Sequence, residues 1–399
     1  MRSPALRHVL THLITPLLMC LGMGLAYMGA FVTPEPNHLP VAVVGAGPGA
    51  KVFAQTVKDA AGDRLDVRTV ATRADAVHLL RSRDITGAYV PAARTPELLV
   101  ATAASDMGAT AAEKVFTPVA AERGAPLKVT DVAAPVADDP TGQGLFFLLI
   151  AVSIGSYASV AALGAAGAAL PMRIRALLAL GVSAVVAGIG ALLAGPVFRL
   201  AHHDLAGVWG MAWLYSAGIL LIGVGLHIFL KRWTTLTMMV LFVMLNFTSS
   251  GGLFGPELQN GFFGALHSFW NGAGFVEGVR SLLYFGDDGL GRTVRTLLVW
   301  LLAGVAVTRS PPPSSAPGPP GRRRRPPRPR RGGPSAPRSG RPTGPRRPRK
   351  RWRRRWACEG ASVLTPGGRD PGPVRSARSA AGPSRTSCTA RRARGAGVR

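Results

Sequence analysis

The sequence predicts a polytopic α-helical membrane protein of about six spans, with an extracytoplasmic α/β domain between spans 1 and 2 and a disordered C-terminal tail. Several apolar stretches have about 20 residues, the length that a helix needs to cross a bilayer core of roughly 30 Å. One long polar stretch, residues 33–143, separates the first of them from the rest. Residues 309–399 hold 26 of the 47 Lys and Arg but only 2 of the 20 acidic residues. The net charge of +27 therefore belongs mainly to the tail.

The first apolar segment, residues 13–32, follows Arg2 and Arg7. We interpret it as an uncleaved anchor because a signal peptide has a shorter apolar core, about 7–15 residues, and a clean A-x-A cleavage site. Residues 1–32 are thus predicted to form an N-terminal transmembrane anchor.

The membrane domain is predicted to cover residues 144–308. Four further spans are expected, at residues 144–170, 176–198, 208–230 and 234–254. The last apolar run, residues 296–307, has about 12 residues where about 20 are needed. It is therefore predicted to be an incomplete sixth span.

Basic residues between the spans predict the orientation. Lys and Arg favour the cytoplasmic side of a membrane. Three basic sites agree on one arrangement: Arg2 and Arg7, Arg173 and Arg175, and Lys231 and Arg232. The prediction is a multi-pass protein of the cell (plasma) membrane, with a cytoplasmic N-terminus and with residues 33–143 outside.

Residues 33–143 show alternating strand and helix patterns. Helices are expected at 52–61, 73–83 and 107–123, and strands at 41–44, 65–71, 85–90, 98–104 and 127–132. Such alternation predicts a small α/β domain built from βαβ units.

The stretch VAVVGAGPGA, residues 41–50, resembles a dinucleotide-binding turn because Gly45, Gly47 and Ala50 occupy the fingerprint positions. However, the third glycine is missing, and Asp66 lies at the start of the next predicted strand rather than at its C-terminal end. We favour a structural turn, in which glycine supplies positive φ and Pro48 fixes the turn. No cofactor is expected.

The predicted spans of the membrane domain are rich in Gly and Ala and contain almost no charge. Small residues let membrane helices approach closely. Glycine-dependent flexing during transport is the alternative, and the sequence leaves both open. The lack of charge argues against proton relays and ion-coupled carriers, because these need buried ionisable groups.

Residues 246–286 form a segment that is too polar to span a membrane and too apolar for a free loop. Short helices are expected near 256–268 and 275–285, at the outer membrane interface. The apolar face of this segment is predicted to contain Phe262, Phe263, Leu266, Phe269 and Trp270.

This segment also carries a family resemblance. The residues concerned are Asn246, Ser249-Ser250-Gly251-Gly252, Pro256-Glu257-Leu258, Phe262-Phe263, Leu266-His267, Val276-Glu277, Arg280-Ser281 and Tyr284-Phe285. Residues 1 to about 308 resemble actinobacterial ABC-transporter-permease-like membrane proteins, which are related to the phage infection protein family and to ABC exporter permeases. Phe247 and Gln259-Asn260 depart from the family pattern, which has prolines there.

The resemblance implies movement of an amphipathic compound, a lipid or a polypeptide across or out of the membrane. The sequence has no G-x-x-x-x-G-K-[ST] motif, so ATP hydrolysis would require a separate cytoplasmic ATPase subunit. Six spans would make half a transporter, which predicts a homodimer or heterodimer. Membrane lipids are the other expected partners, and nucleic acid is not expected.

The main alternative is a non-transport envelope protein that acts through its extracytoplasmic domain in docking, sensing or secretion. An enzyme is not expected, because no nucleophile–base pair or paired acids form one credible site. His202-His203-Asp204 offers three adjacent metal ligands, but a structural zinc site normally has four with wider spacing. No metal is expected.

The residues selected as gate or substrate contacts come from the segment 246–286. They are Asn246, Ser249, Ser250, Gly251, Gly252, Glu257, His267, Glu277, Arg280 and Tyr284. For the charged members, a local salt bridge or exposure to water is the alternative interpretation.

The tail, residues 309–399, consists mostly of Arg, Pro, Gly, Ala and Ser and is predicted to be disordered. Three interpretations compete: binding to nucleic acid, binding to the anionic cytoplasmic leaflet at about 1 kcal/mol per basic residue, and a frameshifted reading of a GC-rich gene. The abrupt end of the short last apolar run at Arg309 favours the frameshift.

Overall fold

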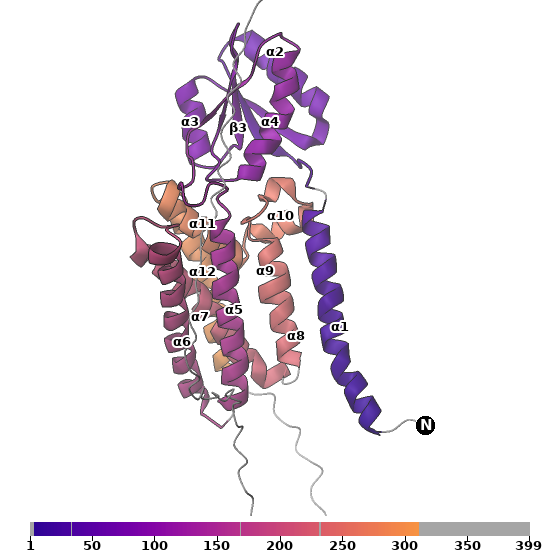
Figure 1. The fold of residues 1–399 in the computed structure, drawn as a ribbon, viewed down its shortest axis with the longest axis vertical. Helices are drawn as coiled ribbons and strands as arrows, with labels where there is room; N and C mark the ends of the chain where they lie inside the picture. The colour runs from indigo at the N-terminus through magenta and orange to yellow at the C-terminus, as the bar shows by residue number, and fades with distance from the viewer. Residues whose placement is uncertain (1–3, 33, 168, 231–232, 311–399) are drawn as a thin grey trace, which may run out of the picture. The chain divides into compact units, whose positions relative to one another are not determined.

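Most of the chain up to Ser310 is described by the computed structural model, namely residues 4–32, 34–167, 169–230 and 233–310. The predicted disorder of the tail falls on residues 311–399, outside the described part. The described chain is mainly helical and carries one five-stranded sheet (Figure 1).

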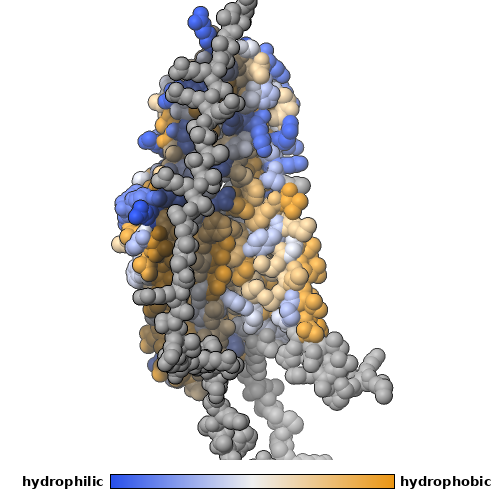
Figure 2. Space-filling model, viewed as in Figure 1, coloured by the Kyte–Doolittle hydropathy of each residue, from blue (hydrophilic) through white to orange (hydrophobic). Residues whose placement is uncertain are grey.

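In the described part of the chain, five helices are long and apolar enough to cross a membrane. They are α1 (Pro4–Phe31), α5 (Gly144–Ala166), α6 (Met172–Leu192, continued by a π-helical turn at Leu193–Val197), α7 (Leu205–Leu230) and α12 (Leu290–Arg309). Their outward side chains are largely apolar, as for Leu17 and Leu177, which are 67% and 68% exposed. Figure 2 shows hydrophobic surface along these helices and hydrophilic surface over the sheet. These features are compatible with a membrane protein.

The span predicted at residues 234–254 is shorter than expected. The helix runs through α8 (Thr234–Met239), a π-helical turn (Val240–Met244) and α9 (Leu245–Thr248), and it does not reach spanning length. The hydroxyls of Ser249 and Ser250 donate to the carbonyls of Leu245 and Phe247, which caps the last turn. Gly251 then takes a left-handed φ of 71°, and the chain leaves the helix.

The prediction of an incomplete last span at residues 296–307 is wrong, because α12 begins at Leu290 and has 20 residues. The apolar run that was used to predict this span leaves out the first turns of α12, because they contain the charged residues Arg292 and Arg295. A long side chain near the end of a helix can keep its charge in water while its stem lies on apolar surface. Since the helix is long enough to span, its length no longer supports a frameshift near residue 308.

Helix α7 lies at the centre of the bundle and packs against α5, α6, α11 (Asn271–Tyr284) and α12. Glycines permit the closest of these contacts. A Cβ at Gly225 would lie 3.0 Å from the backbone nitrogen of Thr308, and one at Gly304 would lie 3.2 Å from the carbonyl oxygen of Gly218. This geometry supports the packing role of the glycines.

The sheet and its helices, here called the sheet domain (residues 39–131), follow the predicted alternation closely. The elements are β1 (Leu39–Val44), α2 (Pro48–Ala61), β2 (Leu65–Val70), α3 (Arg73–Arg81), β3 (Gly87–Val90), β4 (Glu97–Val100), α4 (Asp106–Ala121) and β5 (Lys128–Asp131). The strand order is β2-β1-β3-β4-β5. The β3–β4 pair is antiparallel, because the short connection between these strands cannot make the crossover that parallel strands need. The other pairs are parallel.

The glycine-rich turn between β1 and α2 has a packing explanation. Gly45 has a φ of 150°, and a Cβ there would lie 2.6 Å from the Cβ of Ala50. Pro48 occupies the first position of α2, where its missing N–H costs no helical hydrogen bond. Asp66 is the second residue of β2, at the end of the parallel strands away from this turn.

The sheet domain shares its core with the segment 246–286. Leu258 is 3% exposed and joins the cluster between the sheet and helices α2 and α4. Phe285 is 8% exposed and joins the cluster on the opposite face, under α3. The backbone of Asn37 also donates to the carbonyl of Glu257 at 2.8 Å. The sheet domain is therefore anchored on both faces by residues of the segment 246–286.

Candidate functional site

A charged cavity of about 320 Å³ lies where the sheet domain meets the segment 246–286 and helix α12. The sheet domain contributes the α3–β3 connection and the start of α4 to its wall, including Arg83, Asp84 and Ser105. Five of the residues selected from the sequence line it: Gly251, Glu257, His267, Glu277 and Arg280. The start of α12 adds Arg292, Thr293 and Thr296.

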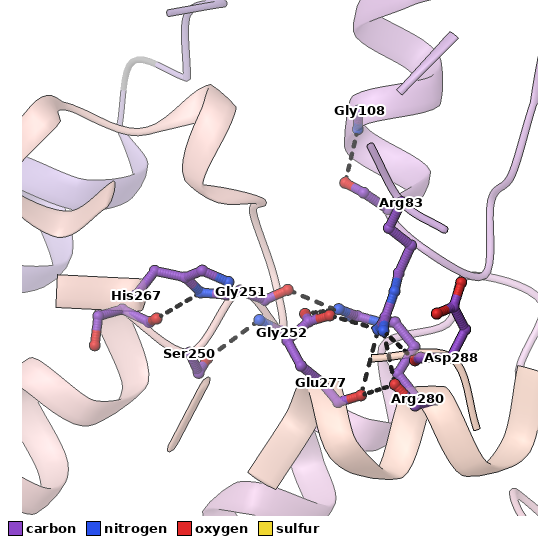
Figure 3. A network of polar contacts seen from close by, with 12 residues as sticks. Arg83, Gly108, Ser250, Gly251, Gly252, His267, Glu277, Arg280 and Asp288 are labelled. Carbon is purple, nitrogen blue, oxygen red and sulfur yellow. Dashed lines mark hydrogen bonds and ion pairs between the residues drawn. The ribbon is translucent and has the colours of Figure 1, made fainter. Parts of the chain in front are cut away.

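Glu277 on α11 is the centre of the charge network (Figure 3). One carboxylate oxygen accepts from Nη1 of Arg83 at 2.8 Å, and the other accepts from Nη1 of Arg280. Residues three apart share a helix face, so Glu277 and Arg280 are positioned by α11 itself. Burial alone would raise the pKa of Glu277, but the charges of Arg280 and Arg83 outweigh it and hold the pKa below its usual value.

Arg83 joins the sheet domain to the helical part. Its guanidinium donates to the hydroxyl of Ser281 at 2.7 Å and to the carbonyl of Asp288 at 2.8 Å, besides its bond to Glu277. It also lies over the ring of Phe285, 5.2 Å from the centroid. The backbone of Arg83 has a φ of 63°, which is uncommon for a residue other than glycine. Sequence reasoning missed Arg83, because its partner Glu277 is 194 positions away.

The loop after α9 is held against the cavity by His267 and Arg280. Nδ1 of His267 lies 3.0 Å from the carbonyl oxygen of Ser249, which can only accept, so Nδ1 carries the proton and Nε2 is an acceptor. Nη2 of Arg280 donates to the carbonyl of Gly251 at 3.3 Å. A Cβ at Gly251 would lie 2.6 Å from Cε1 of His267, so this position requires glycine. Burial lowers the pKa of His267 and keeps the ring neutral near pH 7.

Glu257 lies in a short 3₁₀ turn, Pro256–Leu258, and also lines the cavity. Its carboxylate leaves no room for a side chain at Gly255 and lies near Gly108 in the first turn of α4. Burial raises the pKa of Glu257, and the nearby charge of Glu277 adds to this effect. The structure records no ion pair for Glu257 within the described residues.

The other five selected residues lie outside this cavity. Asn246 is buried in the helix bundle, where its Nδ2 donates to the hydroxyl of Tyr215 at 2.6 Å. Ser249 and Ser250 cap α9, and Gly252 packs closely on Phe146. Tyr284 packs at the edge of the bundle and of the sheet domain's core. These residues shape the loop and the bundle instead of lining the cavity.

The segment's predicted apolar face is divided between core and surface. The short helix α10 (Gly261–His267) buries Phe263, and Trp270 before α11 is also buried. Phe262 and Phe269 are exposed. His202 lies 3.7 Å from Asp138 on the surface, and no group of three or more metal-ligating side chains occurs in the part of the chain that the structure describes.

No protein family, curated protein or solved structure matches this chain. The cavity wall offers donors, acceptors and both signs of charge, contributed by elements far apart in sequence. Such a site is suited to binding a small polar or charged group.

Proposed function

We propose that the protein is a permease-like subunit of the cell membrane, with its N-terminus cytoplasmic and the sheet domain outside. In this proposal it belongs to an ABC-type exporter that moves an amphipathic compound, a lipid or a polypeptide with a separate ATPase subunit. The observation that carries the proposal is the cavity, because its charged wall is built jointly by the sheet domain and by helices α11 and α12.

A bound compound would act on the long helices directly. Glu277 and Arg280 belong to α11, which packs against α7 and α12. Arg292 and Thr293 belong to the first turns of α12. Binding at the cavity would therefore change forces on two helices that contact the centre of the bundle, as a transport cycle requires.

The test is co-purification and efflux. The tagged full chain should co-purify a nucleotide-binding subunit, and cells carrying it should expel a substrate in an ATP-dependent manner. Glu277→Gln should reduce efflux strongly, whereas Asp287→Asn, a change at an exposed acid outside the cavity wall, should not. Repeated clean purification without an ATPase would exclude the ABC version.

Docking or sensing through the sheet domain is the second candidate. The Arg83 link and the shared cores favour it, because an event on the sheet domain would be transmitted to α11. A transport assay distinguishes the two candidates. A substrate-dependent efflux phenotype supports the permease, and normal transport after mutation of the sheet domain's exposed surface counts against docking.

A further inference from the structure

We propose that the charged cavity binds a small zwitterion, meaning a molecule with a primary ammonium next to an acidic group. A free amino acid and the ethanolamine headgroup of a phospholipid both have this chemistry. The inference rests on the proposed function, because it assigns a ligand class to the same cavity.

The charges of the cavity wall are balanced. Three arginines and three acids line it: Arg83, Arg280, Arg292, Asp84, Glu257 and Glu277. A wall with no net charge favours a ligand that carries either both charges or none. The groups that remain without partners decide between these two possibilities.

Internal bonds satisfy part of the wall. Glu277 accepts from two guanidinium groups, and Asp84 accepts from the hydroxyl of Ser82 at 2.6 Å. The carboxylate of Glu257 accepts a hydrogen bond from its own backbone but makes no ion pair with another described residue. The side chain of Arg292 is exposed and makes no ion pair with a described residue. One unpaired acid and one unpaired base therefore face a single cavity, which favours a ligand with both charges.

The acidic group of the ligand would lie on the arginine side. Arg280 is 5% exposed, and its buried Nε–H has no acceptor in the described part of the chain. An unpaired buried donor is costly, and a nearby anionic oxygen would offset that cost. Arg292 adds a second guanidinium from α12, and planar guanidinium groups pair well with carboxylate and phosphate.

The ammonium group would lie on the Glu257 side. Glu257 makes no ion pair and is less exposed than Asp84, the other acid of the wall without one. An ammonium offers three N–H donors to it. Glu257 belongs to the turn Pro256–Leu258, whereas Arg292 belongs to the first turns of α12. The two charges therefore enter the cavity wall from different elements, as the two ends of a dipolar ligand require.

The cavity is small. Its volume of about 320 Å³ is at the lower end of the roughly 300–1,000 Å³ range of ligand pockets. It suits one amino acid or one headgroup, while the acyl chains of a lipid would have to remain outside it.

Calorimetry on the purified full chain in detergent tests the proposal. The probes are alanine and glycerophosphoethanolamine, whose phosphodiester carries a single negative charge as in the phospholipid, with ethylamine and propionate as analogues that each carry a single charge. We expect at least one zwitterion to bind at least tenfold more tightly than both analogues. Binding of alanine alone indicates a soluble amino acid, and binding of glycerophosphoethanolamine alone indicates a lipid headgroup. Binding of neither zwitterion, or equal binding of the analogues, overturns the proposal.

Variants test the two ends separately. Glu257→Gln and Arg292→Gln should each weaken zwitterion binding at least tenfold, and Glu257→Asp should recover part of it. Arg295→Gln is the matched control, because Arg295 lies on the same helix but outside the cavity wall. Unchanged binding in both Gln variants overturns the proposal. Efflux without zwitterion binding would overturn this inference alone, whereas binding without efflux or an ATPase would overturn only the transport function.

Discussion

Arg83 makes a charged connection between the sheet domain and the helical part of the described chain. Its guanidinium reaches an acid, a hydroxyl and a carbonyl, on Glu277, Ser281 and Asp288. A lysine at this position would lack the planar fork that serves several acceptors at once. In a variant with lysine at position 83, Glu277 would still pair with Arg280, but the network would lose bonds to the sheet domain.

We expect Arg83→Gln to loosen the sheet domain. Loss of a part-buried, charge-assisted network costs about 1–3 kcal/mol of stability. Thermal unfolding in detergent should occur at a lower temperature, and hydrogen exchange should increase across β1 and β3. Arg81→Gln is the control, because Arg81 ends α3 and is exposed. Equal exchange in the two variants would contradict the role assigned to Arg83.

His267 predicts a pH dependence. Burial, with the charges of Arg280 and Arg292, lowers its pKa from 6.5, although Glu277 and the carbonyl of Ser249 oppose this shift. As pH falls below about 6.5, the unfolded chain binds a proton that the folded chain does not, so stability falls in this window. We expect His267→Gln to lose less stability than the wild type between pH 7 and pH 5.5.

Thermal unfolding across that pH range measures this effect. His203→Gln is the control, since His203 lies in an exposed loop. If the unfolding temperature of the His267→Gln variant falls with pH as steeply as that of the wild type, other groups cause the pH dependence.

At the scale of elements, hydropathy and alternation predicted most of the fold. The helices α5, α6 and α7 and the elements of the sheet domain lie within a few residues of the predicted ranges. The errors are at α9 and α12, where local hydropathy misleads. Apolar residues continue after Ser249 although hydroxyl caps end the helix, and two arginines precede the apolar part of α12 although the helix has already begun.

The element Pro256–Leu258 gives a direct test of the shared core. Leu258 packs in the cluster that contains Leu39, Val41 and Tyr89. Truncation of a buried leucine to alanine costs about 2–5 kcal/mol. We expect Leu258→Ala to increase hydrogen exchange in β1 and β3, far from the mutation in sequence. Phe262→Ala, at a 60% exposed position nearby, should not. Similar exchange in both variants would argue that the sheet domain folds independently of this segment.

At the scale of the whole molecule, the sequence identified one side of the cavity and missed the other. The segment 246–286 stood out because it combines glycines, charges and aromatic residues. Arg83, Asp84 and Arg292 gave no such signal, since Arg83 and Asp84 follow an ordinary amphipathic helix and Arg292 precedes an apolar run. A cavity formed by the docking of distant elements depends on tertiary contacts that local patterns do not encode.

The proposed orientation places Lys51 and Arg173 on opposite sides of the membrane. Lys51 is exposed on α2 of the sheet domain. Arg173 is exposed in the first turn of α6, at the end of the helix that the positive-inside rule assigns to the cytoplasm. We expect a membrane-impermeant maleimide to label Lys51→Cys in intact cells, in a background where Cys20, Cys358 and Cys388 are serine. Arg173→Cys should be labelled only after lysis. The reverse pattern would invert the topology and place the cavity on the cytoplasmic side, where an exported compound would enter rather than leave.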